Sequence, residues 1–400
     1  MLLYAAALLN PGQETLLEPA LWIRGDTIAY VGATEGLPDE AERDPDTIDL
    51  GEVVICPGLV NSHSHLELTA MQGLPYPGEY VAWIKTLMAA KTGAEPQVQD
   101  EAFHQGILQS LRGGTTCVGD HVSVGANLEA LVRSPLRGRA FIEVLGVVPE
   151  VAADMLKAAV HLQKAWENKS PNIQLCPSPH SVHALAPEIL AKTLNLPEPV
   201  FSIHLAESQC EFDYFSRKSG AMHDFIASRG QPLEREADSA VRELAKLGKL
   251  NGRLMAVHGN YLDGPDLELL AKAGASLVHC PFSHGYFGHG PFPLTQARAA
   301  GLNIALGTDS LASASTLSML EVMREMEKEF PELKREEIFT MATLNGAKAL
   351  KLESVCGSLE AGKKADLIAL PSAGFHPLDA LFRAETVEAI LIGGCFVKPV

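Results

Sequence analysis

The chain has 400 residues, of which 46% are hydrophobic and 20% charged, and its formal net charge at pH 7 is −17. This balance is typical of a folded globular protein and excludes a largely disordered chain. The length exceeds one ordinary small domain but fits a large barrel with an appended domain. Because the acidic excess repels polyanions and no basic cluster offsets it, we expect no nucleic-acid partner.

The first residues, Met1–Leu9, are apolar but lack a basic leader and run into Asn10–Gly12. This pattern predicts a strand and a turn, not a signal peptide. No apolar run reaches the roughly 18 residues that a membrane span needs. The seven cysteines are odd in number and never form a Cys-x-x-Cys pair. We therefore expect a protein of the reducing cytoplasm with no membrane partner and no disulfide scaffold.

Both ends of the chain carry short strand-like runs. Near the N-terminus these are Leu21–Arg24 and Ile28–Val31, joined by a Gly-Asp pair that is typical of a hairpin turn. Near the C-terminus they are Ala365–Ala369 and Val387–Val397. Neither end has enough apolar sequence to form a core alone, so we expect the two ends to pair into one composite β-sandwich domain.

Between these ends, short apolar runs alternate with segments of helical apolar spacing. Continuous apolar strands separated by helices are typical of a parallel sheet covered on both faces. Eight such units over about 260 residues favour a closed (β/α)₈ TIM-like barrel over an open doubly wound sheet. We therefore predict a barrel over residues 58–357 and a small composite β-sandwich from residues 1–57 and 358–400. The eight runs are Val53–Val60, Thr115–Gly119, Ala140–Val148, Ile173–Cys176, Val200–His204, Arg253–His258, Ser276–Cys280 and Asn303–Gly307. Examples of the helical segments are Glu101–Arg112, Ala153–Glu167, Ala237–Leu247 and Pro265–Ala273.

Polar residues follow the ends of the predicted strands. In a (β/α)₈ barrel the carboxyl ends of the strands meet at one mouth, where active sites lie. The residues at these ends are His63 and His65 after the first strand, His180 and His183 after the fourth, His204 and Glu207 after the fifth, His258 after the sixth and Asp309 after the eighth.

His63 and His65 are one residue apart, and alternate residues on a strand point to the same face. An isolated pair of this kind is more often structural or a polar surface feature at the end of a strand. Because His204 and Asp309 lie at the ends of other predicted strands, we interpret His63 and His65 as metal ligands. Three imidazoles and one carboxylate suit Zn²⁺ or Fe²⁺ and leave a position for water, as in catalytic sites. The metal would lower the pKa of this water to about 7, so that hydroxide is available.

Three residues are candidates for proton transfer. Glu207 could carry protons to a ring nitrogen or a leaving amine, or could be a solvated residue favoured at a helix start. His258 could orient the hydroxide, or could be a core histidine with its bonds satisfied. Asp309 could both bind the metal and take a proton from the water.

These motifs resemble the amidohydrolase superfamily, in its cytosine/adenosine deaminase and triazine hydrolase-like branch. The matching segments occur in the family's order and cover nearly the whole chain. The resemblance implies one metal held by His63, His65, His204 and Asp309, with proton transfer by Glu207 and Asp309 and with His258 near the hydroxide. The segments are Pro57–His65, His204–Glu207, His258–Asn260, Leu306–Ser310 and Gly357–Leu367.

The residues that follow the fourth predicted strand bear on the number of metal ions. Binuclear members of the superfamily usually carry a bridging lysine after it, whereas Cys176–His180 contains none. The resemblance therefore implies one divalent metal per chain, Zn²⁺, with Fe²⁺ as the alternative.

Four residues are expected to contact the substrate. Glu67, two residues after His65, resembles an acidic residue of adenosine deaminases that reaches the substrate, although it could simply cap a loop. Trp83 lies in a segment similar to aminodeoxyfutalosine deaminases, although core or subunit packing would also explain it. His180 matches a substrate-contacting histidine of S-adenosylhomocysteine and methylthioadenosine deaminases. His284 lies in Ser283–His289, a stretch that departs from the relatives and is expected to be a loop lining the pocket.

The resemblance implies a hydrolytic deaminase of an adenosine-like substrate with a 5′ group, of the aminodeoxyfutalosine, methylthioadenosine or S-adenosylhomocysteine kind. One alternative is a deaminase of another heterocycle, such as guanine or cytosine, or a triazine-type chlorohydrolase or amidohydrolase. A further alternative is a metal-binding scaffold without catalysis. The expected partner is a small heterocycle, and relatives often form homodimers.

Overall fold

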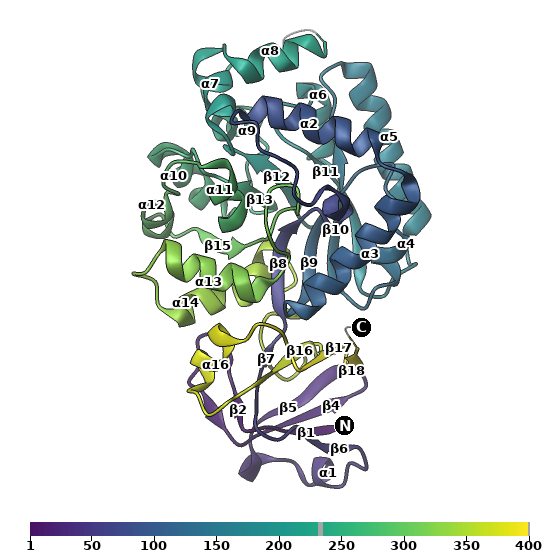
Figure 1. The fold of residues 1–400 in the computed structure, drawn as a ribbon, viewed down its shortest axis with the longest axis vertical. Helices are drawn as coiled ribbons and strands as arrows, with labels where there is room; N and C mark the ends of the chain where they lie inside the picture. The colour runs from purple at the N-terminus through teal and green to yellow at the C-terminus, as the bar shows by residue number, and fades with distance from the viewer. Residues whose placement is uncertain (231–234, 399–400) are drawn as a thin grey trace.

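The computed structural model describes residues 1–230 and 235–398. Its larger part contains two four-stranded parallel sheets, with helices outside the strands (Figure 1). The strand order within each sheet follows the chain, β8-β9-β10-β11 and β12-β13-β14-β15, as expected of consecutive βα units. The strands are β8 (Leu59–Ser64), β9 (Thr115–Val122), β10 (Arg137–Val144), β11 (Ile173–Pro179), β12 (Phe201–Leu205), β13 (Leu254–His258), β14 (Ser276–His279) and β15 (Asn303–Leu306).

The two sheets are joined at both edges. Ser64 at the end of β8 forms a parallel bridge with Asp309 beyond β15, and Ser181 beyond β11 forms one with His204 on β12. At the second junction the amide of His204 donates to the carbonyl of His180 at 2.9 Å. The eight strands therefore close into a (β/α)₈ barrel, and the predicted fold class is confirmed.

Successive residues of the barrel strands enter two different apolar clusters. On β13, Met255 and Val257 belong to one cluster, whereas Leu254 and Ala256 belong to the other. Side chains alternate between the faces of a strand, so one cluster fills the barrel and the other packs against the helices. This burial on both faces explains why the strands read as continuous apolar runs.

Several helices begin where the sequence provides a start signal. Pro149 occupies the first turn of α5, four residues before the predicted start. Ser239 caps α9 by accepting from the amide of Arg242 at 3.1 Å, so that helix begins at 240 and not at 237. The helices are η1 (Thr34–Gly36), α1 (Asp39–Glu42), η2 (Leu66–Met71), α2 (Tyr80–Gly93), α3 (Pro96–Arg112), α4 (Glu129–Arg133), α5 (Pro149–Trp166), α6 (Pro187–Thr193), α7 (Gln209–Arg217), α8 (Ala221–Ser228), α9 (Ala240–Lys246), α10 (Gly264–Ala273), α11 (Pro281–Phe287), α12 (Leu294–Ala299), α13 (Met319–Glu329), α14 (Arg335–Met341), α15 (Leu344–Ala349) and α16 (Pro377–Arg383).

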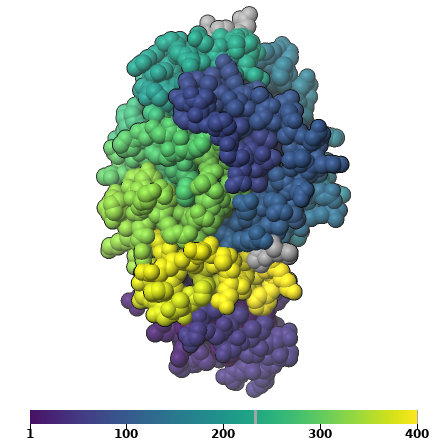
Figure 2. All heavy atoms as spheres, viewed as in Figure 1, coloured from purple at the N-terminus to yellow at the C-terminus, as the bar shows by residue number. Residues whose placement is uncertain are grey.

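Two further sheets lie below the barrel, where both ends of the chain come together, and the six-stranded one contains strands from both ends (Figure 2). Their orders are β5-β4-β1-β6 and β18-β17-β16-β7-β2-β3, and the antiparallel pair of β7 with β16 joins an N-terminal to a C-terminal strand. The domain limits at 57 and 358 stay predictions, and residues 399–400 lie outside the described ranges. The strands are β1 (Leu2–Tyr4), β2 (Ala7–Leu8), β3 (Leu16–Leu17), β4 (Pro19–Arg24), β5 (Thr27–Ala33), β6 (Thr47–Asp49), β7 (Val53–Pro57), β16 (Leu367–Pro371), β17 (Ala389–Ile392) and β18 (Cys395–Val397).

The run Val53–Val60 was expected to be one barrel strand, but it divides at Gly58 into β7 and β8. Gly58 passes so close to β9 that an added Cβ would lie 2.0 Å from Oγ1 of Thr116. Glycine therefore permits the crossing from the composite sheet into the barrel.

Two expectations about the whole chain can be compared with the structure. All seven cysteines are free, which agrees with the absence of a disulfide scaffold. Among the described residues, no helix combines the length and the apolar character that a membrane crossing requires.

Candidate active site

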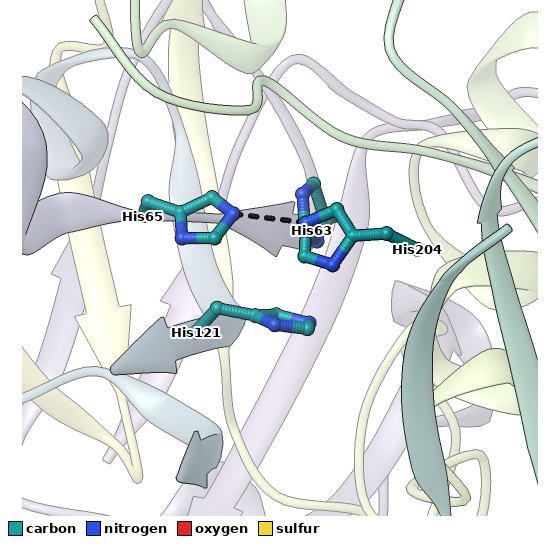
Figure 3. Close-up of side chains that lie close together, drawn as sticks. All are labelled: His63, His65, His121 and His204. Atoms are coloured by element: carbon teal, nitrogen blue, oxygen red, sulfur yellow. Dashed lines mark hydrogen bonds between the residues drawn. The ribbon is translucent and has the colours of Figure 1, made fainter. Parts of the chain in front are cut away.

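Four histidine rings converge at the carboxyl ends of the barrel strands (Figure 3). The ring centroid of His63 lies 4.9 Å from those of His65 and His204 and 4.6 Å from that of His121. Nε2 of His65 is 3.2 Å from Nε2 of His204. One ligand atom from each of the four rings lies within 4.8 Å of the others, which is the compactness of a metal site.

Asp309 lies beside this cluster. Its Oδ1 is 3.7 Å from Nε2 of His63 and 3.9 Å from Nε2 of His65. The carboxylate is oriented by the amide of Ser310, at 2.8 Å, and by the hydroxyl of Ser313, at 3.0 Å. The structure thus brings all four predicted ligands together, although they come from distant parts of the chain.

The first two histidines are placed by a turn that a buried carboxylate holds. Oδ1 of Asp120 on β9 accepts from the hydroxyl of Ser64 at 2.7 Å and from the amide of Leu66 at 2.9 Å. These bonds hold the residues on both sides of His65, which is the first residue after β8. Asp120 therefore orients the turn after β8.

The Gly-Thr-Asp sequence after β15 also has a structural reason. A Cβ on Gly307 would lie 2.8 Å from the carbonyl oxygen of His63, so only glycine allows the two segments to approach. Next to it, Thr308 and Asn61 exchange two hydrogen bonds, at 2.8 and 3.1 Å. The segment that carries Asp309 is thereby fixed to the strand that carries His63.

Three residues at the mouth have left-handed backbone conformations. The φ angles are 52° at Ala206, 71° at His258 and 60° at Asp309. Such angles are unfavourable for residues other than glycine and concentrate at functional sites, where the surrounding structure imposes them. Each of the three ends or follows a barrel strand, so the strain lies where side chains are turned into the mouth.

The histidines fit a divalent metal. Both ring nitrogens of His63 are buried without a hydrogen-bond partner among the described residues, which is rare for polar atoms. Burial holds the pKa values of His63 and His204 well below the usual range, so both rings are neutral near pH 7. Nδ1 of His204 donates to the carbonyl of His180 at 2.9 Å, which leaves Nε2 as a ligand atom.

Glu207 lies between β12 and α7 and is buried. Its backbone is held at both ends, because its amide donates to Glu211 at 2.8 Å and its carbonyl accepts from Asn260 at 2.9 Å. Its Oε1 is 3.7 Å from Nε2 of His258, and its side chain hydrogen-bonds to the Tyr80 hydroxyl. Burial raises the pKa of Glu207 above its usual value, which favours a carboxyl group that takes up and releases a proton.

Glu143 at the end of β10 is a site residue that sequence reasoning missed. Its Oε1 accepts from Nδ1 of His180 at 2.6 Å and is 3.2 Å from Nδ1 of His121. Burial alone would lower the pKa of His180, but Glu143 raises it above the usual value. The available signal was its charge, because it is the only acidic residue within the apolar run Ala140–Leu145.

His121 lies near the end of β9, and both of its ring nitrogens have partners. Nδ1 lies against Glu143, and Nε2 is 2.7 Å from the hydroxyl of Ser202. Both ring nitrogens therefore have partners, in contrast to those of His63. This arrangement fits a residue that supports Glu143 and His180.

A cavity of about 440 Å³ opens at this mouth. It is lined by nearly all of the predicted site residues: His65, Glu67, Trp83, His180, His204, Glu207, His258 and Asp309. His63 lies behind them, fully buried.

Glu67 lies on η2 and faces the cavity from a network of its own. It accepts hydrogen bonds from Lys91 and from the hydroxyl and amide of Ser123, the latter two at 2.7 and 3.1 Å. Lys91 comes from α2 and Ser123 from the segment after β9. The carboxylate is thereby oriented toward the cavity and held apart from the histidine cluster.

The structure corrects the predicted position of His284. The stretch 283–289 was expected to be a pocket-lining loop, but Pro281–Phe287 forms helix α11, begun by its proline, and His284 is not among the residues that line the cavity. Nδ1 of His284 is bonded to Oδ1 of Asn260 at 3.0 Å. Burial lowers the pKa of His284 to about 4. Phe287 packs against Trp83 with ring centroids 4.8 Å apart, so this helix supports the cavity wall from behind.

A (β/α)₈ barrel with buried histidines and an aspartate at the carboxyl ends of its strands is typical of metal-dependent barrel hydrolases. A model described as "Amidohydrolase family" matches residues 54–397, and the chain belongs to this family. The resemblance expected from the motifs is thereby confirmed.

Three similar proteins carry more specific names. The chain is 29% identical over 386 residues to a 5-methylthioadenosine/S-adenosylhomocysteine deaminase of Moorella thermoacetica, covering 92% of this chain and 84% of the relative. A zinc-bound adenosine deaminase of Xanthomonas campestris matches with a TM-score of 0.82, 24% identity and coverage of 99% and 92%. The aminofutalosine deaminase of Helicobacter pylori, in complex with methylthio-coformycin, matches with a TM-score of 0.83, 20% identity and coverage of 99% and 100%. At these identities the two solved structures show the fold alone.

Proposed function

We propose that this protein is a metal-dependent hydrolytic deaminase of an adenosine-like nucleoside that carries a 5′ substituent. The observation that carries the proposal is the position of Glu207. This buried carboxyl group, with a raised pKa, lines the same cavity as the histidine cluster. The named deaminase relatives and the resemblance of Glu67 and His180 to adenosine-type deaminases support the same substrate class.

His63, His65, His204 and Asp309 would hold one divalent metal ion, for which we propose Zn²⁺. The unpartnered nitrogens of His63, the neutral state of the buried rings and the absence of lysine from 176–180 support a single site. When bound, the metal would supply a water molecule that is activated at neutral pH.

Glu207 would move the protons of the reaction. Water adds its oxygen to the ring carbon that bears the amino group, and Glu207 gives a proton to the adjacent ring nitrogen. Asp309 takes one proton from the water, and His258, whose Nε2 lies 3.7 Å from Oε1 of Glu207, orients the water. The bond between carbon and the amino nitrogen then breaks, a proton returns to the nitrogen, and ammonia leaves a carbonyl group behind.

Two other side chains would hold the substrate. His180, with its pKa raised by Glu143, is bonded to Glu143 through Nδ1 and can donate from Nε2 to a purine nitrogen. Glu67 has oxygens that only accept when ionised, which suits the hydroxyl groups of a ribose. Lys91 and Ser123 orient it.

The test is a substrate panel on purified protein, with ammonia release and the ultraviolet change of adenine to hypoxanthine as readouts. The panel compares adenosine, methylthioadenosine and S-adenosylhomocysteine with guanine, cytosine and a chlorotriazine. We expect turnover of the 5′-substituted adenosines and one metal ion per chain by mass spectrometry. Preferential turnover of the chlorotriazine or a free base would contradict the substrate class, and bound metal without any turnover would indicate a scaffold.

A further inference from the structure

Helix α11 carries His284, a buried histidine that does not line the cavity and that the proposed reaction does not use. Its Nδ1 lies 3.0 Å from Oδ1 of Asn260. The amide nitrogen of the same Asn260, which is also buried, donates to the backbone carbonyl of Glu207 at 2.9 Å. A single buried amide group therefore connects His284 to the backbone of the proposed proton carrier.

The direction of each hydrogen bond in this network is determined by the group at its end. A backbone carbonyl only accepts, so the amide nitrogen of Asn260 faces Glu207 and the amide oxygen faces His284. That oxygen also only accepts, so Nδ1 of His284 carries a proton. Burial lowers the pKa of His284 to about 4, so the ring is neutral near pH 7 and has one proton to place. The network therefore requires the tautomer that is protonated at Nδ1.

The segment that carries Glu207 depends on bonds from outside its own strand. Strand β12 ends at Leu205, and Ala206 has a φ of 52°, which is unfavourable for a residue other than glycine. The carbonyl of Ala206 accepts from the amide of Tyr261 at 3.0 Å, and the next carbonyl, that of Glu207, accepts from Asn260. Two consecutive carbonyls are thus bound to the segment after β13, and this attachment holds the strained turn in place.

His284 is itself held by the elements around it. The centroid of its ring lies 5.3 Å from that of His279, which is fully buried on β14. Oε1 of Glu329, at the end of α13, is 3.8 Å from Nε2 of His284, and Oε2 is 3.2 Å from Nε2 of His279. A residue can position another only if packing fixes its own side chain. The contacts with β14 and α13 meet this requirement for His284.

We propose that His284 is a positioning residue for the deamination, and that through Asn260 it fixes the place from which Glu207 transfers protons. The inference rests on the proposed function, because Glu207 carries protons only in that proposal. A displacement of about 1 Å at a reacting group can cost about 10²-fold in rate. Glu211 and Tyr261 still hold the segment when His284 is changed, so we expect a smaller loss. Without the Nδ1 donor, kcat should fall about tenfold, with KM changed by less than about twofold.

Three substitutions of His284 separate its hydrogen bond from its packing. His284→Phe keeps a ring but removes the donor. His284→Asn places an N–H group as many bonds from Cβ as Nδ1, whereas His284→Gln places it one bond further, as Nε2 is. We expect the tenfold loss of kcat in His284→Phe and His284→Gln and recovery of most of it in His284→Asn. The matched control is His289→Phe, which should keep kcat because Nδ1 of His289 lies 3.3 Å from the Tyr261 hydroxyl and not at Asn260.

A double-mutant cycle tests whether His284 acts through Asn260. Asn260→Ala removes both bonds of the amide group, so adding His284→Phe to it should lower kcat no further. Losses that multiply in the double variant would overturn the proposal, as would an unchanged kcat in His284→Phe. Equal kcat values for His284→Asn and His284→Gln would also overturn it, because a merely structural role does not distinguish the two amides. All rates are compared well below the melting temperature of each variant.

Nuclear magnetic resonance of nitrogen-15-labelled histidine provides a readout that needs no turnover. The ring signals of His284 are those absent from the His284→Asn spectrum, and we expect them to show a protonated Nδ1 near pH 7. An unprotonated Nδ1 would overturn the proposed network, whether or not the enzyme is active. A protonated Nδ1 together with no ammonia release from any adenosine derivative would refute the proposed function and leave the bond to Asn260 standing.

Discussion

The role proposed for Glu207 can be tested by Glu207→Gln. The amide has the same shape as the carboxyl group, and the bonds that hold the backbone of Glu207 to Glu211 and Asn260 do not involve the replaced atoms. The variant can still accept the hydrogen bond of the Tyr80 hydroxyl, but it cannot release a proton. The change therefore removes the proton carrier and leaves its surroundings in place.

The expected loss is large in the chemical step and small in stability. A positioned acid–base group contributes about 10²–10⁴-fold to a rate, which corresponds to about 3–5 kcal/mol of transition-state stabilisation. We expect kcat to fall by this factor for 5′-substituted adenosines, with KM nearly unchanged. The melting temperature should change by less than about 2 °C, because no buried hydrogen bond is lost.

Glu211→Gln is the matched control, since Glu211 is buried nearby but has a structural role. It accepts from the amides of Ala206 and Glu207 at 3.0 and 2.8 Å, and an amide group cannot accept both without placing its own N–H groups against a donor. We expect this variant to lose about 1–3 kcal/mol of unfolding free energy. Steady-state kinetics, metal content and thermal unfolding are measured on both variants. A Glu207→Gln enzyme with unchanged kcat would refute the proton-carrier role.

Three further predictions concern stability, pH and metal. Asp366→Asn should lower the unfolding free energy in urea by about 3–5 kcal/mol, because Arg137 would remain buried without its anion. Glu143→Gln should shift the alkaline decline of kcat/KM to lower pH, because the raised pKa of His180 depends on the charge of Glu143 and burial alone lowers it. Removal of the metal by a chelator should lower the melting temperature, and added Zn²⁺ should restore it, because the buried nitrogens of His63 lose their partner.

Each of these three predictions has a control variant or an outcome that would contradict it. Asp26→Asn affects an exposed ion pair with Lys364 and should cost less than about 1 kcal/mol, so an equal effect of Asp366→Asn would contradict the buried-pair argument. A pH profile unchanged by Glu143→Gln would show that His180 does not govern the alkaline decline. A melting temperature insensitive to chelation would argue against a metal bound to His63.

The proposed ligands could be named from the sequence because their positions depend on short-range patterns. Apolar runs separated by helical segments predict the barrel, and in a barrel the strand ends share one mouth wherever they lie in the chain. His63, His204 and Asp309 each sit at such an end, and the structure places them together. For these residues, the spacing of the apolar residues and the fold class that it predicts were enough to place them at one site.

Other features depended on contacts that no local pattern contains. Glu143 meets His180 across 37 residues of sequence, and Lys91 reaches Glu67 across 24. His284 turned away from the cavity because Asn260 supplies its partner.

The sequence by itself determined the alternation that specifies the barrel and the chemistry at the strand ends, including the histidine pair that opens the site. Only the tertiary structure decided that Gly58 divides the first apolar run, because the close approach of Thr116 is a contact between strands. It also decided that Leu87, Val151 and Phe225 line one cavity, because α2, α5 and α8 come together at the barrel mouth. Side-chain partners are chosen by three-dimensional proximity, whereas periodicity records only which face of an element is buried.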